Sequence, residues 1–163
     1  GLNIRRSLTL RAEVAANGVA GAGVVIHGQD AIGPLLSIDG QVSVLIQGLA
    51  LTGAHSTTSQ GGAGSARTGA SVTVRDALLD RTRATLGAGV AASPAASGAI
   101  VNTTISDNSA DHGGGVNAYD RGTITMSTSV VRGNTACWTN PARVRYRESC
   151  NLKGTRPAHV SRP

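Results

Sequence analysis

The sequence is nearly devoid of aromatic side chains, which excludes the usual way of filling a compact core. It contains no Phe, and its only aromatic residues are Tyr119, Trp138 and Tyr146. Compact sandwiches and helical bundles draw much of their buried area from large aromatic side chains. The hydrophobic fraction of 40% nevertheless excludes wholesale disorder, and Gly contributes 22 of the 163 residues. The chain must therefore bury many small and β-branched side chains by stacking them.

Long apolar runs are also absent, and so is a strong charge in the main body. No run approaches the ~20 apolar residues of a membrane span, so we expect no membrane-spanning helix. The net charge of +6 comes mostly from residues 137–163, where five Arg and one Lys oppose one Glu. Residues 1–136 lack the basic face with interleaved aromatics that nucleic-acid binders use. We expect this body not to bind nucleic acid.

An internal repeat, with a period in the range typical of solenoids, organises most of the chain. Two columns of apolar residues recur at nearly constant steps, the second lying a few positions after the first. The columns contain Ile46, Val74, Ile100 and Met126, and Leu51, Leu79, Ile105 and Val131. A third column contains Gly64, Val90 and Val116, each beside a cluster of small residues. Around them apolar and polar residues alternate, which is the period of a strand with one buried face.

These features predict an all-β fold, a parallel β-solenoid. Two or three short strands in each coil pair with the equivalent strands of the next coil, at a spacing of about 4.8 Å. Residues 1–136 hold about five coils of roughly 26 residues each, which is within the period range of solenoid repeats. We expect both long apolar columns to be buried in single files. Residues 137–163 form a basic tail that caps the last coil or is disordered. Because no Met and no signal sequence opens the chain, we expect the N-terminus to be truncated.

Several segments resemble the repeats of right-handed, pectin-lyase-like parallel β-helix proteins of bacteria. They are residues 7–12, 23–28, 44–51 and 102–116. In style these segments also resemble exported proteins of the polymorphic outer-membrane and autotransporter-passenger kind. The resemblance implies a right-handed, single-stranded β-helix and an extracellular or cell-surface location. It implies no particular activity, because this scaffold carries lyases, hydrolases, adhesins and other binders alike.

Catalytic members of that family use clustered acidic residues, with calcium in the lyases, and this sequence has no such cluster. Its acidic residues fall at different registers of the repeat and do not converge as the oxygen ligands of a cation must. We therefore expect no catalytic residue, no metal site and no cofactor, and calcium has no support. The candidates for ligand binding are Asp107, Asp111, His112 and Tyr119. Asp111 and His112 come nearest to a catalytic or metal pair, and the alternative is a solvated turn.

Polar columns offer further candidates. Thr82, Asn108 and Asn134 are predicted to stack at outward positions, either as a structural ladder of hydrogen-bonded amides or as a polar ligand groove. Arg81 and Asp107 would form an ion pair between neighbouring coils. A column of Thr73, Ala99 and Thr125 is interrupted at Ala99, which argues against the regular threonine array of an ice-binding β-helix. His27 and His55 are interpreted as strand-end and loop residues.

The two cysteines lie in the basic tail. Cys137 and Cys150 are close in the sequence, and in an exported protein they can close a small disulfide loop. Two free thiols are the alternative. A zinc site would need two further ligands, and only His159 is near in the sequence.

Two functions remain open. The favoured one is a non-catalytic, exported repeat module with an adhesive, surface or structural role, whose partner is a polysaccharide or a cell-surface molecule. The alternative is a fragment of a polysaccharide-active enzyme, a lyase or a glycosidase, whose catalytic coils are missing or degenerate. Uncapped coil ends additionally predict self-association.

Overall fold

Within the residues that the structure describes, every regular element is a β-strand. The computed structural model describes residues 1–12, 24–29, 32–56 and 60–136. All the strand pairs within them are parallel, and equivalent strands stack at a spacing of about 26 residues. The predicted all-β parallel solenoid is therefore confirmed. The chain makes about four turns, and three of its four sheets are five strands deep.

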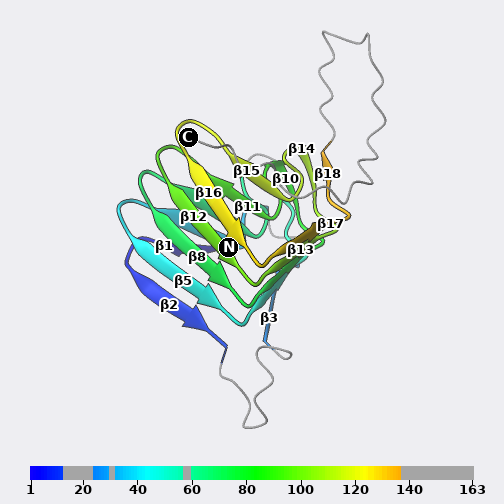
Figure 1. Cartoon of the computed structure of the whole chain (residues 1–163), viewed down its shortest axis with the longest axis horizontal. Coiled ribbons are helices and arrows are strands. Elements are labelled where there is room, and N and C mark those ends of the chain that lie inside the picture. Colours follow the sequence, from blue (N-terminus) through cyan, green and yellow to red (C-terminus); the bar gives the residue numbers. More distant parts are fainter. Residues whose placement is uncertain (13–23, 30–31, 57–59, 137–163) are drawn as a thin grey trace.

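The first and second sheets form two sides of each coil (Figure 1). The first sheet contains β1 (Leu2–Ile4), β4 (Leu36–Asp39), β7 (Gly64–Arg67), β11 (Val90–Ala92) and β15 (Val116–Ala118). The second contains β2 (Leu8–Arg11), β5 (Ser43–Gln47), β8 (Ser71–Arg75), β12 (Ser97–Val101) and β16 (Thr123–Ser127).

The third and fourth sheets complete the coil. The third contains β3 (Val25–His27), β6 (Ala50–Thr52), β9 (Leu78–Asp80), β13 (Thr104–Ser106) and β17 (Val130–Arg132). The fourth contains β10 (Arg83–Leu86), β14 (Ser109–His112) and β18 (Thr135–Ala136). Isolated bridges through Ile32, His55 and Gln60 continue this fourth side toward the first coil.

The corner between the second and third sheets depends on backbone with positive φ. Gly48, Asp76, Asn102 and Thr128 occupy this corner in successive coils, with φ values of 69°, 51°, 46° and 50°. A left-handed residue reverses the local twist and turns the chain sharply. Asp and Asn adopt this conformation at less cost than most residues with side chains, because they form local hydrogen bonds. The same corner is thereby repeated in four successive coils.

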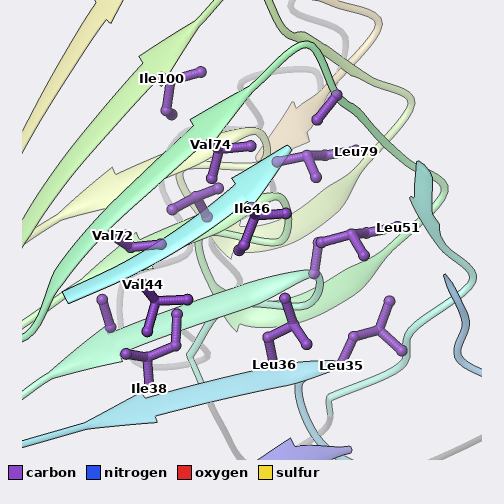
Figure 2. Packing of buried hydrophobic residues seen from close by; sticks show 14 of the residues in the cluster. Leu35, Leu36, Ile38, Val44, Ile46, Leu51, Val72, Val74, Leu79 and Ile100 are labelled. Atoms are coloured by element: carbon purple, nitrogen blue, oxygen red, sulfur yellow. The ribbon is translucent and has the colours of Figure 1, made fainter. Parts of the chain in front are cut away.

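Apolar side chains fill the interior in files, as predicted from the repeat. Ile46 pairs in register with Val74, and Val74 with Ile100. Figure 2 shows these three side chains one above another inside the coil. In the third sheet Leu51, Leu79 and Ile105 form a parallel file, and all of them are almost fully buried.

The last coil departs from the expected burial. Met126 is only partly buried, and Val131 is 38% exposed, although both continue their files in register. Each lies on a strand that has a single neighbour among the described residues. The prediction that the whole second file is buried is therefore wrong at Val131.

The tail predictions fall on residues 137–163. Trp138, the Cys137–Cys150 disulfide and the capping role of the tail all lie outside the described residues. The right-handed winding likewise stays a prediction.

We expect Gly64→Ala to stabilise the protein and Gly89→Ala to destabilise it. A Cβ on Gly64 would meet no atom within 4 Å, beside a small cavity of about 10 Å³ between Ile38, Val72 and Val90. A Cβ on Gly89 would collide with the Gly115 carbonyl oxygen and lie 2.8 Å from Ile105 Cγ2. Buried area and lost chain entropy predict a gain of about 1 kcal/mol for Gly64→Ala, and overpacking a loss of about 1–3 kcal/mol for Gly89→Ala.

Urea unfolding of both variants measures these free energies. If Gly64→Ala is as destabilising as Gly89→Ala, the interior does not have the open space described at Gly64.

Candidate functional site

The outward side of the second sheet gathers accessible hydroxyl groups from all five of its strands. Val72 and Val74 of β8 are buried, so the alternating Ser71, Thr73 and Arg75 face outward. The same alternation in the other strands gives a surface that we call the hydroxyl face. Its Ser and Thr residues are Thr9, Ser43, Ser71, Thr73, Ser97, Thr123, Thr125 and Ser127. Leu45 and Ala99 interrupt it.

An open hollow of about 620 Å³ lies on this face over β2, β5 and β8. Its side chains come mainly from Ser7, Thr9, Ser43, Leu45, Ser71, Thr73 and Arg75. The Ser7 hydroxyl is occupied, because it accepts a hydrogen bond of 2.9 Å from the Ser43 N–H. The hydroxyls of Ser71 and Thr73 have no protein partner among the described residues. They are available to a ligand.

A polar corner borders the hydroxyl face where β8 ends. Asn102 Nδ2 donates to Asp76 Oδ1 at 2.8 Å, and Gln47 Nε2 donates to Asp76 Oδ2 at 3.2 Å. The pKa of Asp76 is lowered from its ordinary value of 3.8 chiefly by these two hydrogen bonds, with a smaller contribution from the charge of Arg75. Asp76 is thus an ionised carboxylate that links three successive coils.

The predicted amide column exists, but it faces inward and not outward. Asn108 is 1% exposed and Thr82 is fully buried. Asn108 Nδ2 donates to Asn134 Oδ1 at 2.9 Å and to the Leu79 carbonyl at 3.0 Å, while Asn108 Oδ1 accepts from the N–H and the hydroxyl of Thr82. Every polar atom of the Asn108 side chain is therefore used inside the protein. A groove for a ligand is not available there.

The structure does not join Arg81 to Asp107. The two residues occupy equivalent corners with φ of 50° and 56°, but Arg81 Nε donates to Asp80 Oδ2 of its own coil at 2.8 Å. Arg81 therefore forms its ion pair with the adjacent residue of its own coil. The predicted ion pair between Arg81 and Asp107 of the next coil is wrong.

The four predicted ligand-binding residues lie at three separate places, because only Asp111 and His112 share a strand. Asp107 occupies the corner between β13 and β14, Asp111 and His112 end β14, and Tyr119 follows β15. None of them belongs to the hydroxyl face. Among the described residues no group of three or more His, Cys, Asp or Glu side chains is placed to hold a metal ion. His27 lies at the end of β3, and His55 forms an isolated bridge.

Ser71, Arg75 and Gln47 are not among the site residues predicted from the sequence. A signal for them is present there, because Ser71, Ser97 and Thr123 recur at equal steps beside the apolar column and are register partners. A search for a regular array of threonines alone does not find this column, because it contains both Ser and Thr.

No protein-family model, no curated protein and no solved structure gives a significant match to this chain. Among the described residues there is no helix of the length and apolarity needed to cross a membrane.

Replacing Asp76 by Asn is expected to remove part of the acid sensitivity of folding. The folded-state pKa of Asp76 is lowered, so its stabilising contribution is complete above 3.8 and is lost as the pH falls through the folded-state value. Asp76→Asn keeps a residue that tolerates the corner, but it removes the charge and one of the two acceptors. The difference in urea midpoint between wild type and Asp76→Asn should shrink as the pH falls below 3.8.

Asp120→Asn provides the control, since Asp120 also lies at a corner with a φ of 48°. An unchanged difference at every pH for Asp76→Asn would show that its carboxylate does not support the corner.

Proposed function

We propose that this chain is a non-catalytic binding module of the exported, right-handed, pectin-lyase-like β-helix kind. It binds an extended polysaccharide along the hydroxyl face, at the cell surface or outside the cell. The observation that carries the proposal is the open hollow beside Arg75, in which the Ser71 and Thr73 hydroxyls have no partner within the described part of the chain. The export and the family come from the resemblance of the repeats, not from the face itself.

The repeat of the sheet favours a polymeric ligand. Equivalent side chains recur on successive strands about 4.8 Å apart, so a group that contacts a ligand on one coil has a similar group beside it on the next coil. The Ser and Thr hydroxyls both donate and accept hydrogen bonds, and the Arg75 guanidinium donates them, so the face can pair with sugar hydroxyls in both directions. A linear chain of sugar units lying across the strands can make several of these contacts at once. Once the first contact has formed, the others form within the same complex, so the overall affinity exceeds that of a single contact.

The state of Asp76 supports a binding role in preference to catalysis. A general acid or base is most effective when its pKa lies near the working pH. Hydrogen bonds from Asn102 and Gln47 occupy both carboxylate oxygens of Asp76 and lower its pKa. This carboxylate at the border of the face is therefore poorly suited to proton transfer at neutral pH.

The double variant Ser71→Ala, Thr73→Val tests the hydroxyl face. Thr73→Val keeps the shape of the side chain and Ser71→Ala only shortens it, and each substitution removes one hydrogen-bonding hydroxyl, which contributes about 1 kcal/mol. Binding to immobilised neutral and acidic polysaccharides should therefore weaken by roughly tenfold or more. Thr104→Val, on the third sheet, is the matched control and should bind like wild type.

Equal binding by the double variant and by wild type would exclude the hydroxyl face as the site. Release of reducing ends or unsaturated products from polygalacturonate by the wild type, with or without calcium, would contradict the non-catalytic part of the proposal. Loss of that activity on replacing Asp76, Asp107 or Asp111 would favour the enzyme alternative.

A further inference from the structure

Both ends of the coil stack expose apolar side chains next to open strand edges. In the described part of the chain, β1, β2 and β3 at one end each pair with one neighbour, and so do β15, β16 and β17 at the other. The exposed large apolar side chains lie in the first and last coils, with Leu78 as the exception. They are Leu2, Val24, Val25 and Ile32 in the first coil, and Val130 and Val131 in the last. Such an edge is a template for pairing with another chain.

The backbone groups at both ends point outward along the stack. Alternate residues of a strand direct their N–H and C=O groups to opposite neighbours. The Ala12 N–H donates to the Gln47 carbonyl of the second coil, so the groups of Thr9 point away from the stack. At the other end the Thr123 N–H donates back to the Ala96 carbonyl, so the groups of Ile124 point away. As far as the described residues show, donors and acceptors are therefore open at both ends.

We propose that copies of this chain stack end to end, with the last coil of one copy pairing with the first coil of the next. The partner is a second copy because the internal register continues across such a joint. Leu8 and Ile124 are the two ends of one inward file, and Ile26 and Val131 are the two ends of another. One further step of the register therefore places apolar on apolar inside the joint.

The outward positions match at the same joint. The register places Thr125 of one copy on Thr9 of the next, and Val130 on Val25. The joint thus has the same parallel pairing and the same kind of side-chain contacts as the pairs of coils inside the molecule.

Charge favours this arrangement over one in which two first coils meet. The first coil carries Arg5, Arg6 and Arg11, and two such coils would bring six Arg residues together. In the end-to-end joint the corner with Arg5 and Arg6 meets the equivalent corner of the last coil, where Asp120 and Arg121 cancel. A joint between two different surfaces does not close on itself, so it produces filaments that lengthen with concentration.

Sedimentation velocity of residues 1–163 over a wide range of concentration tests the proposal. The wild type should show species larger than the monomer that grow with concentration. Val25→Lys, at a side chain that is 56% exposed, should shift the distribution to monomer, because a charged edge opposes pairing. Val130→Lys should cause the same loss from the other side of the joint. Far-UV circular dichroism checks that each variant is folded.

The double variant Val25→Lys, Val130→Glu distinguishes the two arrangements. Lys at 25 of one copy then faces Glu at 130 of the next, so the large species should return. Leu78→Lys is the control, because Leu78 lies in the same outward file but inside the stack, and it should assemble like wild type. A wild type that is monomeric at every concentration overturns the proposal. So does a double variant that stays monomeric, or a Leu78→Lys variant that loses assembly as Val25→Lys does.

Discussion

The stacking of each residue on its equivalent in the next coil is the constraint on which the rest of this structure depends. In a parallel sheet the side chain of one strand lies beside the side chain of its register partner, so unlike neighbours would leave voids or unpaired polar groups. The chain meets this constraint by repeating residue type at a step of about 26 residues. Ile46, Val74 and Ile100 form an apolar file for this reason, and Asn108 and Asn134 form a polar one.

The same constraint explains how a chain with almost no aromatic residues forms a core. Each coil buries a few aliphatic side chains, and inside the stack each of them lies beside its register partners in the coils above and below it. Polar groups at the corners satisfy one another along the stack, as Asp76 does with Gln47 and Asn102. On the outside, stacking produces surfaces of one chemical kind. The hydroxyl face is mainly such a surface, and the binding role that we propose for it rests on repetition and not on a single set of catalytic groups.

The sequence was sufficient to predict the apolar files that repeat at the regular spacing of about 26 residues. Alternation along each strand shows which residues face inward, and the spacing stays nearly constant over most of residues 1–136. The sequence was not sufficient for the first coil. Leu10 and Ile46 are register partners although the segment between them is longer than in the later coils, so no constant step reveals the pair. Side-chain direction at corners also could not be predicted. Asn108 follows a residue with positive φ, which turns its amide inward and buries it. Arg81 pairs with the carboxylate of Asp80 in its own coil, and this pairing depends on local geometry and not on register.

Removal of one complete coil tests the central claim most directly. Ser71 and Ser97 are register partners, so deleting residues 71–96 joins Ala70 to Ser97 and should leave every remaining residue on its equivalent. The shortened protein should unfold in urea in one cooperative transition, followed by circular dichroism, with strand content like that of the full chain. Deleting Thr73 alone from the full-length chain should abolish cooperative unfolding, because the deletion moves Val74 to the outward side of β8. A shortened protein that does not fold, or a Thr73 deletion that unfolds like wild type, would contradict the account.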